Sequence, residues 1–334
     1  MDKLNIPEMN KILVVRIGKI GDIIATSFVF EVIKANNPYA EITLLTKETN
    51  RNVLKYNNKI DSIIYVGSGL KRYFKLFSLR RKKFDLILDF NDNPSRTTKM
   101  IFSSFNARFK CGYNFPLYNQ LLDIAVKQPD KEKTHIIDRM RSFLEDIGYT
   151  CREDLVKPFM YTGGNEEKEI AALFSKFKGR EIIALNISAG AGIRFWNCEN
   201  WIGLIKKIHQ LDMNFAFVLL SVKEDRNEAE EIKSNFSPDI LIKSGFDSFQ
   251  HFAAAIKASR LLITPDTSAV HAAASFGVPV VALYPKSDWN FASWRPYKIA
   301  AKAILSKEDS VNAISIDEVF NNFVELNKEI NVNG

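Results

Sequence analysis

Apolar positions along the chain form short continuous runs that alternate with stretches of helical spacing. Residues 11–16 (KILVVR) are an apolar run closed by Gly18, which predicts a buried parallel strand. Residues 20–36 have helical spacing up to the helix-ending pair Asn37-Pro38. A further helix is predicted at 70–82, and further strands at 42–45, 62–66 and 84–89. Strands that alternate with helices predict an α/β fold with a parallel sheet wrapped on both faces.

The same pattern restarts in the second half of the chain. Residues 149–165 have weak periodicity and contain Pro158 and the pair Gly163-Gly164, so we interpret them as a linker. After it come predicted strands at 181–188, 215–221, 261–264 and 278–283, and predicted helices at 199–211, 248–258 and 268–276. We therefore predict two doubly wound domains, 1–155 and 156–334, with a ligand cleft at the carboxyl ends of their strands.

Charge is shared unevenly between the two halves. The formal net charge of the chain is +7. Residues 1–150 carry 25 Lys and Arg against 16 Asp and Glu, a net charge of +9, so the remaining residues have a net charge of −2. A basic N-terminal half indicates an anionic partner, such as a phosphorylated glycolipid, a membrane surface or nucleic acid. No recognition motif for nucleic acid accompanies the charge, so we expect no nucleic-acid partner.

The stretch 71–83 concentrates this charge among aromatic residues. Two interpretations remain open: an amphipathic element at an anionic membrane surface, or a helix that faces the core and exposes a basic side. Its seven cations are Lys71, Arg72, Lys75, Arg80, Arg81, Lys82 and Lys83.

Targeting signals are missing from the sequence. It has no run of about 18 apolar residues, and its first eleven residues lack the apolar core of a signal peptide. Cys111, Cys151 and Cys198 are odd in number and lack the spacing of metal ligands, which predicts structural thiols in a reducing compartment. We expect a cytoplasmic protein.

Chemistry-bearing residues gather where the predicted strands end. The first strand leads into Arg16, Gly18, Lys19, Gly21 and Asp22, in the pattern RxGxxGD. Glycines here let the backbone approach a ligand, and the following helix offers free N–H groups. The pattern is neither the dinucleotide fingerprint nor a Walker loop. Asp22 is either a general base that faces the cleft or a carboxylate that only complements the helix dipole.

A Gly-rich loop in the second half of the chain carries further candidates. Ser188, Gly190 and Arg194 lie in the loop SAGAGIRFW, which suits a pyrophosphate held by backbone amides and one cation. A flexible loop with a solvated arginine is the alternative interpretation.

The third candidate segment follows the predicted strand 261–264. Asp266 and Thr267 are placed to cap a helix at the carboxyl end of this strand, and Ser268 follows them. His271 lies on the face of that helix that looks toward the strand end. We predict that it faces a ligand.

These three features, in this order and spacing, resemble glycosyltransferase family 9, the ADP-heptose:lipopolysaccharide heptosyltransferases. They are the RxGxxGD start, the Gly-rich loop with a basic residue two positions before Trp196, and the DTxxxH motif followed by AAxxGxP. Residues 294–297 (WRPY) also resemble the W-x-P-Y stretch of the family. The resemblance covers essentially the whole chain. It implies a GT-B fold of two Rossmann-like domains facing across a cleft, with the acceptor on 1–155 and the nucleotide sugar on 156–334.

The resemblance also implies an activity: inverting, metal-independent transfer of a heptose or related sugar from an ADP-sugar to a lipopolysaccharide-core or similar glycan acceptor. Asp22 matches the proposed general base, and Arg194 stands where the family usually has a lysine on the diphosphate. Asp266, Thr267 and His271 match the nucleotide- and phosphate-binding turn.

Other positions match the family less closely. Ser268 replaces the glycine of the DTG turn, and residues 187–190 lack the His and Pro of the usual His-Pro-Gly loop. Glu224 is a loose match to the carboxylate that grips the ribose. No cofactor or metal is implied. The implied partners are a nucleotide-sugar donor, an anionic glycolipid or glycan acceptor, and the cytoplasmic face of the inner membrane through 71–83.

Alternative functions remain beside this one. They are a GT-B enzyme that uses another nucleotide sugar, a sugar-nucleotide epimerase, a protein O-heptosyltransferase, and a non-catalytic protein that binds a sugar nucleotide or an anionic glycan. An epimerase would need carboxylate and histidine groups around the sugar, and the motifs do not supply them. A metal-dependent transferase would need a DxD-like pair, which residues 89–92 (DFND) do not form.

Overall fold

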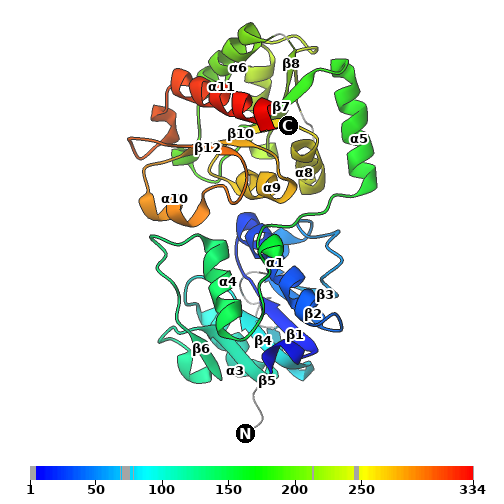
Figure 1. The fold of residues 1–334 in the computed structure, drawn as a ribbon, viewed down its shortest axis with the longest axis vertical. Coiled ribbons are helices and arrows are strands. Elements are labelled where there is room, and N and C mark those ends of the chain that lie inside the picture. The colour runs from blue at the N-terminus through cyan, green and yellow to red at the C-terminus, as the bar shows by residue number, and fades with distance from the viewer. Residues whose placement is uncertain are drawn as a thin grey trace. The chain divides into compact units, whose positions relative to one another are not determined.

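The computed structural model describes residues 5–67, 69, 76–77, 79–212, 214–243 and 248–333. The chain divides into two compact units, Met1–Phe159 and Met160–Gly334. The change of unit therefore falls within the segment 149–165, four residues after the predicted boundary at 155. Each unit is described by itself below (Figure 1).

The N-terminal unit contains one six-stranded parallel sheet in the order β3-β2-β1-β4-β5-β6. Its strands are β1 (Lys11–Val15), β2 (Glu41–Lys47), β3 (Ser62–Val66), β4 (Lys83–Asp89), β5 (Asn106–Tyr113) and β6 (Ile124–Val126), and its helices include α1 (Ile20–Asn36), α3 (Arg96–Ser104) and α4 (Ile136–Asp146). The predictions for 20–36 and 62–66 match α1 and β3 residue for residue. Strands β1 and β4 are neighbours, and their register pairs Val15 with Asp89, so both strands end at the same edge.

The C-terminal unit repeats this architecture with the strand order β12-β11-β10-β7-β8-β9. Its strands are β7 (Glu181–Asn186), β8 (Phe215–Leu220), β9 (Leu241–Lys243), β10 (Leu261–Pro265), β11 (Val280–Tyr284) and β12 (Ala301–Leu305). Its helices are α5 (Gly164–Phe174), α6 (Cys198–Leu211), α7 (Arg226–Lys233), α8 (Phe249–Lys257), α9 (Ser268–Phe276), α10 (Asp288–Trp294) and α11 (Ile316–Asn333).

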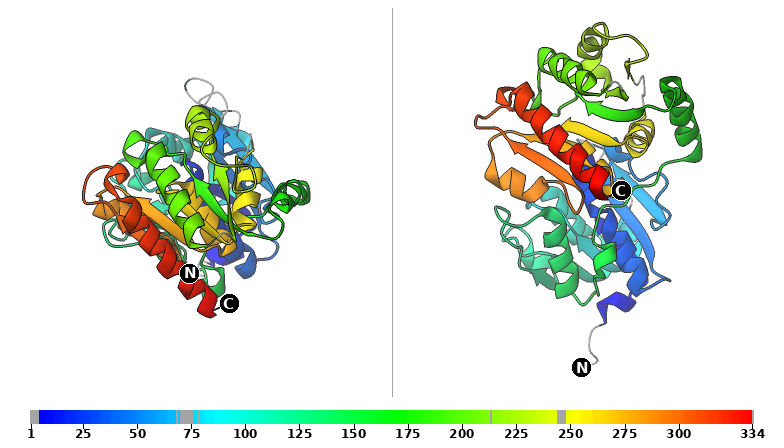
Figure 2. Two further views of the ribbon diagram at one scale, coloured as in Figure 1. Left: turned by 90° about the horizontal axis from the view of Figure 1, so that it is seen from above. Right: turned by 45° about the horizontal axis from the view of Figure 1, so that its top comes forward.

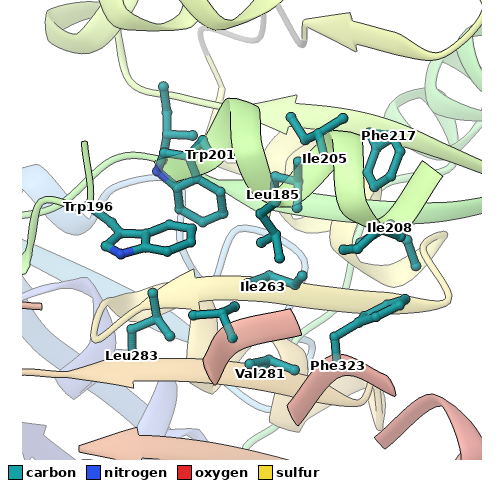
Figure 3. Packing of buried hydrophobic residues seen from close by; sticks show 14 of the residues in the cluster. Leu185, Trp196, Trp201, Ile205, Ile208, Phe217, Ile263, Val281, Leu283 and Phe323 are labelled. Carbon is teal, nitrogen blue, oxygen red and sulfur yellow. The ribbon is translucent and has the colours of Figure 1, made fainter. Parts of the chain in front are cut away.

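Alternation along the strands separates two faces of this second sheet. The odd-numbered apolar residues of β7, β8, β10 and β11 share one core with α6, α7 and α11, because successive side chains of a strand point to opposite faces. Figure 2 shows α6 and α11 together over that face. In this core Trp196 and Trp201 meet edge to face with ring centroids 4.9 Å apart (Figure 3). Trp196 also donates a hydrogen bond to the carbonyl of Ile314 (2.9 Å), which ties the loop 187–197 to the core.

Some predicted boundaries were wrong. The strand predicted at 181–188 ends at Asn186. The backbone N–H of Ile187 still donates to the carbonyl of Leu220, but the neighbouring strand β8 ends there and offers no further partner. The strand predicted at 278–283 begins at Val280, after Pro279, whose nitrogen cannot donate to a ladder.

The helix predicted at 70–82 falls partly on residues 70–75 and 78, which lie outside the described residues. At its end the prediction was wrong, because Leu79–Arg81 form a 3-10 turn and β4 begins at Lys83. The apolar alternation of β4 requires an extended chain from there on.

Among the described residues, no helix is both long and apolar enough to cross a membrane. The three cysteines are free and buried. Burial raises the pKa of the Cys151 thiol to about 11 and the pKa values of Cys111 and Cys198 to about 12, so all three are protonated near neutral pH.

Candidate active site

The RxGxxGD segment forms a closed arrangement between β1 and α1. The Arg16 side chain is almost completely buried, and its guanidinium donates to the carbonyl of Phe90 and to Oδ1 of Asp22 (2.7 Å). Oδ2 of Asp22 accepts the backbone N–H of Lys19 at 2.6 Å. Both oxygens of this carboxylate are thus fixed, while 21% of the side chain stays exposed. Asp22 does cap its helix, and the cap leaves the carboxylate accessible.

Gly18 is required by this arrangement. A Cβ atom at position 18 would lie 2.4 Å from Cβ and 2.5 Å from Cγ of Asp22. These atoms are next to the backbone and have little freedom to move, so a larger residue would displace the carboxylate. The first glycine of the motif therefore gives Asp22 the space to fold back over the loop.

Residues at the end of β4 support the same loop, and sequence reasoning missed them. The side-chain Oδ1 of Asn91 accepts the backbone N–H of Ile17 (2.8 Å). Asp89 is 1% exposed; burial raises its pKa to about 7, although hydrogen bonds from Asn91 and the charge of Arg16 lower it. Polar residues directly after a buried strand were the available signal, but residues 89–92 were considered only as a metal site.

In the C-terminal unit, Asn186 joins two of the predicted segments. Its Nδ2 lies 2.9 Å from Oγ1 of Thr264, 3.1 Å from Oγ1 of Thr267 and 3.2 Å from the carbonyl of Ser188. The hydroxyl of Ser188 in turn accepts the N–H of Val222, at 2.8 Å. The predicted residues Ser188 and Thr267 are therefore brought together at the carboxyl ends of β7 and β10. An asparagine inside a buried apolar strand was the missed signal.

Arg194 and Asp266 form an ion pair in the same region. The guanidinium lies 3.3 Å from Oδ2 of Asp266 and donates to its backbone carbonyl at 3.1 Å. Oδ2 also accepts Nδ2 of Asn290 from α10, at 2.6 Å. Asp266 is 5% exposed, whereas 29% of the Arg194 side chain is exposed. The Arg194 guanidinium is thus held by a buried carboxylate, while part of the Arg194 side chain stays accessible. Asn290 supports this carboxylate and was not identified from the sequence.

The helix α9 begins at this cluster. Thr267 is its N-cap, and its Oγ1 accepts the N–H of Ala269 (3.2 Å). Ser268, half-buried, is its first residue. His271 is 3% exposed and meets the ring of Trp294 edge to face, with centroids 5.6 Å apart. A ligand-facing role for His271 stays a prediction.

Two predicted donor residues are not joined to this cluster. Gly190 is exposed in the loop after β7, and a Cβ atom there would meet nothing within 4 Å. Glu224 is exposed in the 3-10 turn Lys223–Asp225 after β8. No hydrogen bond or ion pair among the described residues connects Glu224 to Arg194 or Asp266. Within the described ranges, no group of three or more His, Cys, Asp or Glu side chains is placed to hold a metal ion.

Two doubly wound parallel-sheet units in one chain, each Rossmann-like, define a GT-B fold. The crystal structure of a glycosyl transferase family 9 protein from Veillonella parvula superimposes with a TM-score of 0.84 at 21% identity, covering 96% of this chain and 98% of that one. For Escherichia coli ADP-heptose lps heptosyltransferase II the TM-score is 0.78 at 20% identity, over 96% and 99%.

Sequence comparison identifies the family. The lipopolysaccharide core heptosyltransferase OpsX of Haemophilus influenzae is 24% identical over 277 residues, which cover 81% of this chain and 78% of that protein. The family model for glycosyltransferase family 9 (heptosyltransferase) matches residues 73–323, more than half of the chain. The chain therefore belongs to glycosyltransferase family 9 (heptosyltransferase), and it is a glycosyltransferase.

Proposed function

We propose that this enzyme is an inverting, metal-independent transferase that moves a heptose or related sugar from an ADP-sugar to a lipopolysaccharide-core or similar glycan acceptor. The observation that carries the proposal is the Asp22 carboxylate, held by Arg16 and by the Lys19 N–H in the RxGxxGD loop and still accessible. The similar proteins support the donor and acceptor classes, since they include an ADP-heptose heptosyltransferase and a lipopolysaccharide core heptosyltransferase.

Asp22 serves as the general base in this proposal. The acceptor hydroxyl oxygen forms a bond to the anomeric carbon of the donor, the bond from that carbon to the diphosphate breaks, and the hydroxyl proton passes to Asp22. Attack from the face opposite the leaving group inverts the anomeric configuration. Arg16 and the Lys19 N–H hold the carboxylate in one orientation, which a positioned base requires.

The C-terminal unit supplies the groups that receive the donor. Arg194 and the positive dipole end of α9, at its N-terminus, stabilise the charge that develops on the departing diphosphate, as cations and fixed dipoles do without a metal. Asp266, whose carboxylate is itself oriented by Asn290, holds Arg194 in place. The small residues of the loop that begins at Ser188 let phosphate oxygens approach the backbone.

The test is to incubate the enzyme with ADP-heptose, with and without a heptose-accepting core glycan, and to measure ADP and the sugar products. ADP release that depends on the acceptor supports the proposal. A rearranged sugar nucleotide without acceptor indicates an epimerase, and calorimetric binding without turnover indicates a non-catalytic protein. A panel of other nucleotide sugars, each tested in the same way, identifies a different donor.

We also propose that the enzyme works in the cytoplasm, at the cytoplasmic face of the inner membrane. Of the basic stretch, Arg80, Arg81, Lys82 and Lys83 are described and exposed, and Arg80 lies 5.0 Å above the ring of Phe77, which is 67% exposed. Lys71, Arg72 and Lys75 lie outside the described residues. An exposed aromatic ring with Arg80 over it, followed in the chain by three more exposed cations, suits an anionic lipid surface.

Replacement of Arg80, Arg81, Lys82 and Lys83 by glutamine is expected to weaken binding to vesicles that contain anionic lipid, because each cation near such a surface contributes about 1 kcal/mol. Sedimentation of the protein with these vesicles measures the loss, and neutral vesicles are the control. Turnover of a soluble truncated acceptor should stay at the wild-type rate. Unchanged vesicle binding would mean that these four residues form only a solvated surface.

A further inference from the structure

Two loops meet at the carboxyl edge of the N-terminal sheet: the loop after β1, which carries Asp22, and the loop after β4. The meeting follows from the sheet order, since β1 and β4 are hydrogen-bonded neighbours and Val15 pairs with Asp89. Two bonds cross between the loops. The Arg16 guanidinium donates to the carbonyl of Phe90, and the Ile17 N–H donates to Oδ1 of Asn91 at 2.8 Å.

Hydrogen bonds to Asp89 and Thr98 fix the orientation of the Asn91 side chain. Its Nδ2 donates to Oδ1 of Asp89 (2.5 Å) and to Oγ1 of Thr98 (3.3 Å), and its backbone N–H also donates to Oδ1 of Asp89 (3.1 Å). With its amide nitrogen occupied in this way, the side-chain oxygen points to Ile17. Asn91 is 9% exposed and Asp89 1% exposed, so water competes little for these bonds.

The other side of the β1 loop is held independently. Asn50 donates to the carbonyl of Gly18 at 3.1 Å and is itself bonded to the hydroxyl of Thr46 at 3.0 Å. The loop is therefore fixed between β2 and β4. Of these two sides, as far as the structure describes them, it is the β4 side that also bonds the Arg16 guanidinium that holds Asp22. A shift of the loop on the β4 side moves both groups that orient the Asp22 carboxylate, which are Arg16 and the Lys19 N–H.

We propose that Asn91, oriented by the buried side chain of Asp89, is a positioning residue for catalysis: it fixes the loop that presents Asp22 to the acceptor hydroxyl. Asn91 acts through Ile17 and the loop backbone and needs no contact with the substrate. This inference rests on the proposed function, in which Asp22 is the base. It identifies two positioning residues, neither in contact with the substrate, that lie outside the RxGxxGD motif.

The test compares Asn91→Ala with Asn36→Ala in the full-length enzyme. Asn36 is a matched control, since it bonds the N–H and the carbonyl of Thr150, each at 3.0 Å, at the other end of α1. Asn91→Ala is expected to lower kcat about 10²-fold with an unchanged KM for the donor, as a small misplacement of a catalytic group does. Asn36→Ala should lower the melting temperature and leave kcat unchanged. Equal kcat values in the two variants overturn the proposal.

A second pair of variants examines the role of Asp89. Asp89→Asn keeps a carbonyl that can accept the Asn91 amide, so kcat should stay near the wild-type value, whereas Asp89→Ala should share the loss seen in Asn91→Ala. Loss of kcat in both Asp89 variants alike would contradict the orienting role.

A readout that does not need turnover separates this inference from the proposed function. With carbon-13 in aspartate and nitrogen-15 in lysine, NMR reports the Asp22 carboxyl carbon and the Lys19 N–H. In the wild type this N–H donates a hydrogen bond to Oδ2 of the Asp22 carboxylate. Both signals should move in Asn91→Ala and not in Asn36→Ala. If they stay in place, the positioning role is wrong even where activity falls. If they move but the wild type transfers no sugar, the proposed function is wrong and the positioning of Asp22 stands.

Discussion

Asp22→Ala is expected to lower kcat by about 10²–10⁴-fold, the contribution typical of a positioned general base. The donor KM should hold, because in the proposed mechanism the donor binds to the C-terminal unit. Steady-state kinetics with a saturating acceptor measure both quantities. Asp22→Asn should be nearly as inactive, since an amide keeps the shape and the cap on the Lys19 N–H but cannot take up the acceptor proton.

The capping role of Asp22 makes the opposite prediction for this pair. If Asp22 only caps α1, asparagine should restore activity, and the alanine variant should lose about 1 kcal/mol of stability and no rate. Asp61 provides a matched control in the same unit: its carboxylate accepts the Ile42 N–H at 2.7 Å and pairs with Lys34 at 2.9 Å, but at the amino ends of the strands. Asp61→Asn should leave kcat unchanged. A fully active and stable Asp22→Asn enzyme removes Asp22 from the mechanism.

Arg194→Ala is expected to weaken binding of an ADP-sugar by about 1.5–3 kcal/mol, the range for a hydrogen bond to a charged group. Isothermal titration calorimetry with the nucleotide sugar measures the change. Arg194→Lys should lose less binding free energy, because the ammonium group keeps the positive charge. Some loss is still expected, since lysine lacks the paired N–H geometry of a guanidinium.

Arg260→Ala is the control for Arg194→Ala. Arg260 also pairs with a carboxylate of the C-terminal unit, Glu181, at 2.7 Å, but this pair lies where β7 and β10 begin. Its removal should change stability alone. Equal donor affinity in Arg194→Ala and in the wild type would refute the donor-binding role of Arg194.

Local patterns in the sequence were sufficient for most of the strands and helices. The run at 11–16 and the Asn37-Pro38 stop delimit β1 and α1 well, because burial and helix termination are decided by neighbouring residues. The 3-10 turn at Leu79–Arg81 was missed, since basic residues at helical spacing favour a helix until the adjoining strand imposes an extended chain. The end of β7 depends on its partner strand β8, which a local pattern does not show. The start of β11 could have been predicted from Pro279.

The candidate site was predictable only in part, for a similar reason. Asp22, Arg194 and Asp266 lie in motifs of recognisable spacing, so they could be selected from the sequence. Asn91 follows a buried strand, which was a usable signal, but its target Ile17 lies 74 residues away in the chain. Asn290 could not be selected, because it contacts Asp266 across 24 residues. Their relevance comes from the strand order, which places distant loops side by side. The Arg16–Asp22 bond was within reach, since both residues belong to one short motif.

The anchoring of Trp196 has a consequence for the order in which the protein matures. The indole N–H is bonded to Ile314, and the backbone N–H of the next residue, Asn197, is bonded to the side chain of Asn312. The loop that carries Arg194 is thus fastened to a segment synthesised more than one hundred residues later, just before α11. A nascent chain in which residues 312–314 are still inside the ribosome lacks these two hydrogen bonds. If Arg194 binds the donor as proposed, donor recognition requires that the segment around Ile314 has already been synthesised and has folded onto this loop.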